Sequence, residues 1–448
     1  MERIVIKKLN EVYVQAIPTE SHIAYELNDY FKFKVPNYQF HPKYKARIWS
    51  GDIFLYSMLT KQIYTGLTPQ IEQFAKERDY EIEYEYDNSS ENFSLVEAKQ
   101  FADSLGLKIE PRDYQLDAFV YAVRNRRALL LSPTASGKSL IIYMLTRFYN
   151  LPTLIIVPTI TLVHQLYSDF IDYGYATPNL IHKITGGVEK ETDALITIST
   201  WQSIYKLKKD YFQKFGLVIG DEAHLFKAQS LVAILTKLTQ CKYRFGLTGT
   251  LDGSLTNKLV LEGLFGRVKK VISTTELIQQ KHISNLTIKS IVLNYPDSVC
   301  NDAKKYTYVE EMDFLVRNEL RNKFIKNLAL SLKGNTLILY QYVEKHGEVL
   351  YKLLENTPDR PVFFVHGGVD GEERNEIRAI VEKEKNAIIV ASYGTMSTGI
   401  NIKNLHNLIF ASPSKSIVRI LQSIGRALRQ AEQKEVATLF DIADNLSY

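Results

Sequence analysis

The sequence predicts an α/β fold made of two parallel-sheet lobes in tandem, with a small α+β domain before them. From Ser94 onwards, short apolar runs alternate with polar loops and helical periods, which is typical of βαβ units. Two such series follow one another, so we expect two sheets. The length of 448 residues also exceeds one ordinary core, and the hydrophobic share of 45% is that of a globular protein.

Residues 1–92 are rich in Tyr, Phe and Lys and are expected to form the small α+β domain. Short alternating runs predict strands here, with turns at Ser50-Gly51-Asp52 and Thr65-Gly66. The acidic stretch 84–92 predicts a linker. The expected elements are alternating runs over Arg3–Leu9 and Arg47–Tyr56, a helix over Gln70–Arg78 and an exposed strand over Glu81–Tyr86.

The two lobes are expected over residues 93–275 and 276–448, joined between Val271 and Ser284. The apolar runs of the first lobe are Ala128–Leu131, Thr153–Val157, Ala194–Ser199, Leu217–Ile219 and Tyr243–Leu247. Those of the second are Thr336–Tyr340, Val362–Val365, Ala387–Val390, Leu408–Phe410 and Thr438–Phe440. Two sheets in series imply two lobes with a cleft between them.

The composition excludes several classes of protein. Cys241 and Cys300 are too few for a disulfide framework, which indicates a reducing, intracellular setting. The N-terminus lacks the apolar core of a signal peptide, and no later stretch is long and uncharged enough to cross a bilayer. We expect a soluble, cytoplasmic protein with no membrane partner. The net charge of +5 permits a polyanionic partner without demanding one.

A phosphate-binding loop is indicated between the first apolar run and a helix beginning near Leu140. There, backbone N–H groups would face the phosphates of ATP, Lys138 would add a point charge, and the Ser139 hydroxyl would hold Mg²⁺. Ser132 stands where the strict pattern has Gly, so this motif alone leaves an ordinary strand–turn–helix open. The residues expected to bind ATP here are Thr134, Ala135, Ser136, Gly137, Lys138 and Ser139.

Two adjacent acids, Asp221 and Glu222, follow the Leu217–Ile219 run. This is the strand end at which doubly wound folds build their sites. Asp221 would hold Mg²⁺, and Glu222 would polarise the attacking water. Two solvated acids at a strand end are common in isolation. Their position about eighty residues after a phosphate loop, with His224 completing an Asp-Glu-Ala-His tetrad, predicts an ATPase instead.

Together these motifs resemble a superfamily 2 helicase, whose signature blocks run in order from about Arg112 to Arg429. The resemblance implies two RecA-like lobes, ATP and Mg²⁺ as cofactors, nucleic acid as partner, and a catalytic role for His224. The Arg-Asp-Tyr-Gln block at the start matches the family's adenine-contacting segment. Gln115 would read the adenine edge, and Arg112 or Tyr114 would pack on the ring.

Later blocks match segments that couple the lobes. Gly249 stands where many relatives have Ala, in the segment linking hydrolysis to lobe motion. Gly399 and Asn401 match the fifth motif, which implies that they contact ATP, with Asn401 at the ribose; many relatives carry Asp where Asn401 stands. Gln422, Arg426 and Arg429 match the sixth motif. The two arginines would reach across the lobe interface and stabilise the transferred γ-phosphoryl group, which contributes ~10³–10⁵ in rate. The alternative is a pair of surface arginines.

Other segments match blocks that contact nucleic acid. The candidates are Thr159, Thr200, Trp201, Tyr340, His366, Gly367 and Thr395. Trp201 is equally well explained as a core residue, because large aromatic side chains are usually buried.

The resemblance extends to the phage UvsW family of branched-DNA helicases. The segments that carry it are Tyr38–Pro42, Trp49–Gly51, Gly246–Leu251, Ala391–Gly394 and Ser397–Gly399. It implies a single-stranded and branched DNA substrate, with roles in recombination, replication or repair inside a bacterial host. We expect a monomer, with replication or recombination proteins as further partners.

The N-terminal domain interleaves basic and aromatic residues, a composition that suits duplex or junction binding. The residues are Lys32, Lys34, Lys43, Lys45 and Arg47 with Tyr30, Phe31, Phe33, Tyr38 and Phe40. A solvated basic face over an aromatic core explains them equally well, and only the family resemblance favours DNA contact.

Three alternatives stay open. An RNA helicase would carry the same Asp-Glu-Ala-His tetrad. The motor subunit of a restriction system would use the same engine, although no acidic-plus-lysine nuclease motif is found in the sequence. A non-catalytic clamp on a degenerate motor fold is disfavoured by the intact Lys138, Asp221, Glu222, Arg426 and Arg429.

Overall fold

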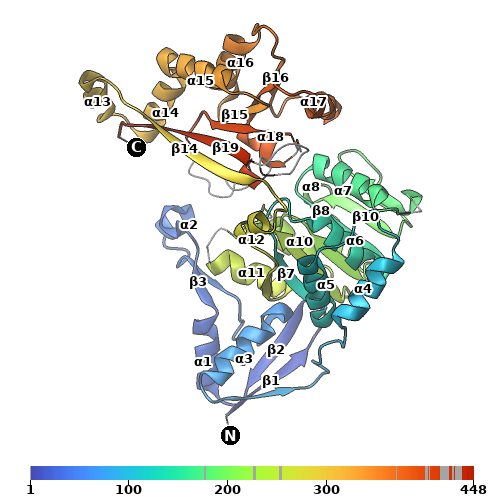
Figure 1. Ribbon diagram of the computed structural model, residues 1–448. Helices are drawn as coiled ribbons and strands as arrows, with labels where there is room; N and C mark the ends of the chain where they lie inside the picture. The colour runs from blue at the N-terminus through green and yellow to red at the C-terminus, as the bar shows by residue number, and fades with distance from the viewer. Residues whose placement is uncertain are drawn as a thin grey trace. The chain divides into compact units, whose positions relative to one another are not determined.

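The computed structural model forms two compact units, Met1–Ser273 and Thr274–Tyr448 (Figure 1). The described residues are 2–175, 178–225, 229–251, 255–369, 371–398, 402, 404–413, 423–425, 428 and 436–447. The first unit contains a small domain and a seven-stranded sheet, and the second contains a six-stranded sheet. Among the described residues, no helix is both long and apolar enough to cross a membrane.

The N-terminal domain is a four-stranded sheet covered by two helices. Its elements are β1 (Arg3–Lys8), β2 (Tyr13–Pro18), α1 (Ser21–Tyr30), β5 (Gln62–Tyr64), η2 (Thr65–Leu67), α3 (Thr68–Lys76) and β6 (Glu81–Tyr84). The strand order is β5-β2-β1-β6. Ile4 and Ile6 alternate with more exposed residues along β1 and pack in one core with Leu27 of α1 and Phe74 of α3. The period of two in the sequence therefore sets which face is buried.

A two-stranded ribbon extends from this domain. It pairs β3 (Lys32–Lys34) antiparallel with β4 (Asp52–Phe54). Between the strands, η1 (Tyr38–Phe40) and α2 (Pro42–Lys45) form the end of the ribbon, away from the four-stranded sheet (Figure 1). We call residues 32–54 the basic arm.

The end of the basic arm corrects one prediction from the sequence. Of the alternating run Arg47–Tyr56, only Asp52–Phe54 is a strand. The chain turns before it because Arg47 and Gly51 have φ angles of 56° and 85°. A Cβ at Gly51 would collide with the Tyr38 ring, so this position requires glycine.

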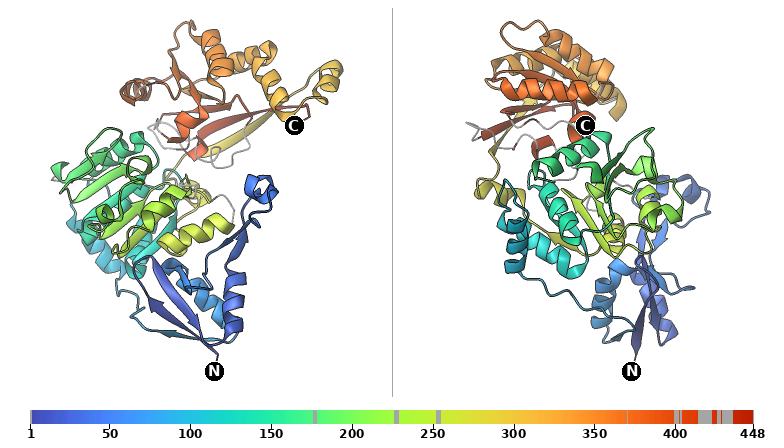
Figure 2. Two further views of the ribbon diagram at one scale, coloured as in Figure 1. Left: turned by 180° about the vertical axis from the view of Figure 1, so that it is seen from behind. Right: turned by 90° about the vertical axis from the view of Figure 1, so that its right-hand side faces the viewer.

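Lobe 1 is an all-parallel sheet with helices on both faces (Figure 2). Its elements are α4 (Leu95–Ser104), α5 (Asp113–Asn125), β7 (Arg127–Leu131), α6 (Lys138–Tyr149), β8 (Thr153–Val157), α7 (Ile160–Asp172), η3 (Pro178–Leu180), β9 (Ile181–Ile184), β10 (Ile196–Thr200), α8 (Trp201–Ile204), α9 (Lys209–Phe212), β11 (Leu217–Gly220), η4 (Ala223–Leu225), α10 (Gln229–Leu235), β12 (Tyr243–Thr248), α11 (Leu255–Phe265) and β13 (Val268–Lys270). The strand order is β13-β7-β12-β11-β8-β10-β9.

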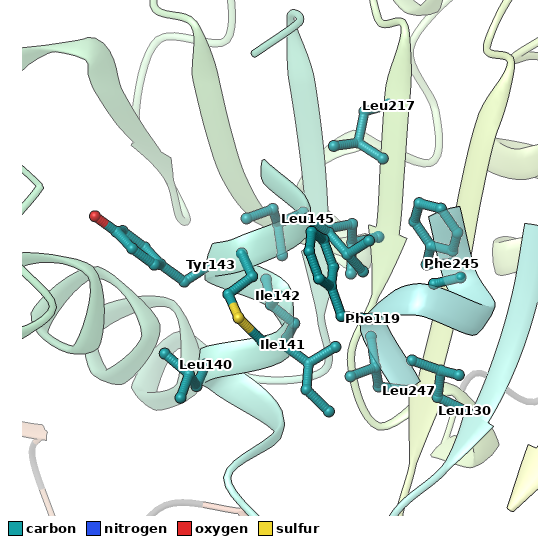
Figure 3. Packing of buried hydrophobic residues seen from close by; sticks show 14 of the residues in the cluster. Phe119, Leu130, Leu140, Ile141, Ile142, Tyr143, Leu145, Leu217, Phe245 and Leu247 are labelled. Carbon is teal, nitrogen blue, oxygen red and sulfur yellow. The ribbon is translucent and has the colours of Figure 1, made fainter. Parts of the chain in front are cut away.

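The lobe 1 sheet is buried on both faces. Every residue of β8 and β10 is buried, which explains their continuous apolar runs. Helices α4 to α7 pack on one face and α8 to α11 on the other. Figure 3 shows Phe119 of α5 and Leu145 of α6 beside Leu130 and Leu247 of the sheet. This packing fixes the strand ends from which the candidate site is built.

Lobe 2 is a second all-parallel sheet, with the order β14-β19-β18-β15-β17-β16. Its unit contains α12 (Thr274–Gln279), β14 (Asn285–Leu293), α13 (Asp297–Ala303), α14 (Tyr308–Arg317), α15 (Glu319–Ser331), β15 (Thr336–Tyr340), η5 (Val343–Gly347), α16 (Glu348–Leu354), β16 (Val362–Val365), α17 (Gly371–Lys383), β17 (Ile388–Ser392), α18 (Tyr393–Thr398), β18 (Asn407–Phe410) and β19 (Val436–Asp444). The predicted fold class is confirmed: a small α+β domain is followed in the sequence by two parallel-sheet lobes.

Candidate functional site

The predicted phosphate loop connects β7 to α6 at the carboxyl end of the lobe 1 sheet. Gly137 and Ala135 have φ angles of 79° and 69°, so the loop turns sharply before the helix begins at Lys138. Ser132 is buried, and its hydroxyl lies 2.6 Å from that of Ser136. The departure from glycine at position 132 is therefore accommodated by a hydrogen bond inside the loop.

The upstream block packs directly on this loop. Gln115 donates from Nε2 to the Ser136 carbonyl at 2.9 Å, and its Oε1 accepts from the Arg112 backbone N–H at 2.9 Å. The Tyr114 hydroxyl donates to the same Ser136 carbonyl at 2.9 Å. A Cβ at Gly137 would collide with the Gln115 amide, so a glycine is needed for this close approach. These residues, predicted to contact adenine, hold the phosphate loop in this structure.

Asp221 and Glu222 stand immediately after β11, beside the loop. The Glu222 backbone N–H donates to Asp221 Oδ1 at 2.9 Å, and its φ of 51° is a left-handed conformation unusual for this residue. Lys138 Nζ lies 3.3 Å from Glu222 Oε1, and both side chains are largely buried. Burial raises the pKa of the Asp221 carboxyl well above its usual range, and the charge of Glu222 adds to this effect.

His224 joins the acidic segment to the end of β12. Its Nδ1 lies 2.6 Å from the Thr248 hydroxyl and 3.5 Å from Glu222 Oε2. The Thr248 hydroxyl donates to the Thr250 carbonyl at 2.8 Å. A Cβ at Gly249 would meet its neighbours at 3.6 Å or more, so the Ala of many relatives would fit. The structure thus links the acids to the segment predicted to couple hydrolysis to lobe motion.

Tyr173 is a residue that the sequence analysis missed. Its hydroxyl lies 2.9 Å from Ser139 Oγ, the predicted Mg²⁺ ligand, although it follows α7, far along the chain. Its ring packs against Tyr143 of α6 with centroids 5.4 Å apart. Ser139 and Asp221 offer hard oxygen donors, which fits Mg²⁺ completed by phosphate oxygens and water. No local pattern in the sequence points to Tyr173, because its partner is reached only through the fold.

The predicted nucleic-acid contacts of lobe 1 lie at the same strand ends. Thr159 follows β8 and caps α7, where its hydroxyl accepts from the Leu162 N–H at 3.4 Å. Thr200 is buried, and its hydroxyl lies 2.9 Å from that of Ser203. Trp201 is half-buried against the hydrophobic core and meets Tyr205 edge-on at 5.9 Å. Trp201 thus packs partly in the core, and its contact with nucleic acid stays a prediction.

In lobe 2, Tyr340 corrects the prediction. It is fully buried, and its hydroxyl donates to the Val365 carbonyl at 3.4 Å, so its side chain is not available to nucleic acid. Gly367 is exposed after β16, next to the half-buried His366. Thr395 is buried, with its hydroxyl 2.7 Å from that of Ser392, so the predictions for Thr395 and for the buried Thr200 are corrected in the same way. The predicted residues Gly399, Asn401, Gln422, Arg426 and Arg429 lie outside the described residues.

Three known families match successive parts of the chain. The model described as "DNA helicase UvsW, N-terminal" matches residues 4–85. That described as "Type III restriction enzyme, res subunit" matches residues 108–253, and "Helicase conserved C-terminal domain" matches residues 319–431. The matches include the phosphate loop and the Asp221–His224 tetrad.

A curated protein of Enterobacteria phage T4, "ATP-dependent DNA helicase uvsW", is 36% identical over 446 residues, which is 96% of this chain and 88% of the T4 protein. This chain belongs to the UvsW family of superfamily 2 helicases. The crystal structure of T4 UvsW, 34% identical, covers 99% of this chain and 90% of its own, with a TM-score of 0.57.

The UvsW-family chain is also similar to a more distant relative. "DNA 3'-5' translocase XPB2" of Sulfurisphaera tokodaii is 25% identical over 442 residues, which is 90% of this chain and 94% of that protein. The match covers most of the length of both proteins.

Proposed function

We propose that this chain is an ATP-dependent DNA helicase that remodels branched DNA, with ATP and Mg²⁺ as its cofactors. The observation that carries the proposal is the meeting of Lys138 and Glu222, 3.3 Å apart, beside Asp221 and the phosphate loop. A cation and two acids around one loop suit phosphoryl transfer to water. Membership of the UvsW family supports the coupling of that reaction to nucleic acid.

Each residue of the site has a role in this proposal. Backbone N–H groups at the start of α6 and the Lys138 ammonium would bind the phosphates. Ser139 and Asp221 would hold Mg²⁺, which when bound offsets charge on the phosphate oxygens. Glu222 would orient and polarise the attacking water. The hydrogen bond between His224 and Thr248 would couple a change at the two acids to the end of β12.

The proposal also assigns roles to residues of lobe 2 that match the family's motifs. Arg426 and Arg429 would stabilise the γ-phosphoryl group, Gln422 would act in catalysis, and Gly399 and Asn401 would contact the nucleotide. Thr159, Trp201, His366 and Gly367 would contact a single strand, by phosphate contacts and by stacking where an aromatic ring is available.

DNA is the proposed substrate for two reasons. The T4 relative is described as a DNA helicase and the Sulfurisphaera relative as a DNA translocase. The basic arm also exposes Lys32, Lys34, Lys43, Lys45 and Arg47. Lys32 and Lys34 pair with Asp29 and Asp52, whereas the sequence between Tyr30 and Gly51, which contains Lys43, Lys45 and Arg47, has no Asp or Glu. The end of the arm therefore attracts phosphates. More distant relatives are described as putative RNA helicases, so RNA belongs in the test.

The test measures Mg²⁺-dependent ATP hydrolysis alone and with single-stranded DNA, duplex, fork, four-way junction and matched RNA. The proposal expects the largest stimulation with forks or junctions, and its loss in Glu222→Gln. Stimulation by RNA alone would contradict the DNA substrate. No stimulation by any nucleic acid would contradict the helicase proposal as a whole.

A further inference from the structure

Aromatic contacts join the residues at the end of the basic arm. Tyr38 and Tyr44 meet edge-on with ring centroids 4.8 Å apart, and His41 meets Trp49 edge-on at 5.2 Å. Trp49 Nε1 donates to the Asp52 carbonyl at 2.9 Å. These aromatic contacts, with the tight turn at Gly51, hold the end of the arm in one shape.

Two apolar side chains are left outside this aromatic frame. Phe40 is 68% exposed and Ile48 is 77% exposed, while Tyr44 and Trp49 beside them are half-buried. Burying Phe40 and Ile48 against the neighbouring aromatic rings would lower the free energy, yet both side chains stay in water. Exposure alone does not indicate a partner, since Leu59 is 92% exposed, but Phe40 and Ile48 lie on an arm that also exposes several cations.

The surroundings of Ile48 indicate the chemistry of a partner that would fit this end of the arm. A surface hollow of about 520 Å³ beside Ile48 is lined by Gln39, Tyr44, Lys45, Arg47, Ile48, Trp49 and Ser50. Apolar and aromatic faces here adjoin Lys45 and Arg47, and none of the residues that line the hollow is acidic. A nucleic-acid branch point offers the matching pattern, because its last base pair exposes flat apolar faces while phosphates surround them.

We propose that the end of the basic arm is a wedge for the branch point of DNA, with Phe40 and Ile48 covering the base faces exposed there. Lys43, Lys45 and Arg47 bind the phosphates on either side of the branch. Apolar side chains inserted at base steps are an established means of unstacking DNA. This inference rests on the proposed DNA function and adds how the branch itself is recognised.

The experiment uses the full chain without ATP, and forks that carry 2-aminopurine at the branch point or ten base pairs away from it. The variants are the double Phe40→Ala/Ile48→Ala and, as a matched control, Leu59→Ala, which removes a 92% exposed apolar side chain off the arm. The Kd for fork and for plain duplex is measured for each protein, and thermal unfolding checks that each is folded.

The proposal predicts that wild type and Leu59→Ala raise the fluorescence of the branch-point base and leave that of the distant base unchanged. The double variant loses this signal, and its preference for fork over duplex falls about tenfold or more, since stacking on a base contributes that much. Lys43→Ala/Lys45→Ala weakens fork and duplex binding alike, because phosphates occur in both.

Two results would overturn the wedge. One is that the double variant keeps the branch-point signal and the fork preference of wild type. The exposed side chains would then serve a protein partner instead of DNA. The other is an equal loss of fork and duplex binding, which would make them general contacts. Failure of the wild type to bind any DNA, by contrast, contradicts the proposed function.

Discussion

Lys138 Nζ lies 3.3 Å from Glu222 Oε1, so the phosphate-loop cation and the proposed water-polarising acid pair with each other across the site. The γ-phosphate of ATP would compete with Glu222 for the same ammonium. Releasing Glu222 from Lys138 would free its carboxylate to polarise water. The ion pair would thus make nucleotide binding release the Glu222 carboxylate, which can then polarise water.

We predict that Glu222→Gln slows hydrolysis while leaving ATP binding intact or tighter. The amide keeps the shape of the side chain but loses its basicity and its charge, so it competes less for Lys138. Turnover should fall about 10²–10⁴-fold, the usual contribution of a general base. Steady-state hydrolysis and equilibrium binding of a fluorescent ATP analogue measure the two effects. Weaker ATP binding in this variant would contradict the competition.

Tyr173→Phe should weaken Mg²⁺ binding in the nucleotide complex. The hydroxyl orients Ser139 from 2.9 Å, and partners of metal ligands typically contribute 10–100-fold to metal affinity. The ring and its packing on Tyr143 are kept. A titration of nucleotide binding with Mg²⁺ measures the shift. Tyr143→Phe is the control, since its hydroxyl pairs with Arg147 instead. Equal Mg²⁺ dependence in all three proteins would show that Tyr173 is only a packing residue.

Arg244 is a buried residue on which lobe 1 depends for stability. Its guanidinium donates to the carbonyls of Leu235, Leu238, Cys241 and Leu264 at 2.7 to 3.3 Å. Arg244→Met would leave these buried carbonyls without their donor and cost at least about 3 kcal/mol in urea unfolding. Arg3→Met removes only an exposed ion pair with Glu83 and should cost less than about 1 kcal/mol. Similar losses in both variants would contradict the argument.

His346 should make the stability of lobe 2 depend on pH. Burial lowers the pKa of its imidazole to about 3, and Arg321 adds to this effect. The ring lies between the Ser412 hydroxyl at 2.9 Å and Asn322 Oδ1 at 3.1 Å. In the unfolded chain the imidazole has a pKa near 6.5 and binds a proton at a pH where the folded chain keeps it neutral. The contribution of His346 to the free energy of unfolding is therefore complete above about pH 6.5. Below that pH it falls by up to about 1.4 kcal/mol per pH unit.

Urea unfolding of wild type and His346→Gln from pH 7.5 to 5.0 measures this contribution. The free energy of unfolding of the wild type should fall more steeply with acid than that of the variant. Parallel curves would show that another group accounts for the pH dependence.

The limits of a strand can be predicted from the sequence where the strand is buried on both faces. Thr153–Val157 and Thr336–Tyr340 have every residue buried, and their predicted limits match β8 and β15. The positions of Lys138 and the two acids just after strands were also predictable, because each motif is a local pattern attached to a buried strand. Local pattern and global burial agree there.

The sequence was less informative where the fold brings distant groups together. Strand β14 lies at a sheet edge with most of its residues exposed, so it lacks an apolar run. Tyr173 reaches Ser139 only through helix packing. Tyr340 is a predicted nucleic-acid contact by resemblance alone, yet packing with Phe364 and the nearby core buries it. Contacts between distant residues leave no signature in a single sequence.

The most direct test of the central claim is ATP-driven conversion of a synthetic four-way junction, followed by gel electrophoresis with wild type and Glu222→Gln. The proposal predicts that wild type resolves the junction into forked or duplex products only with Mg²⁺ and ATP, and that Glu222→Gln binds it without converting it. A wild-type protein that hydrolyses ATP on single-stranded DNA yet leaves every branched substrate unchanged would contradict the account.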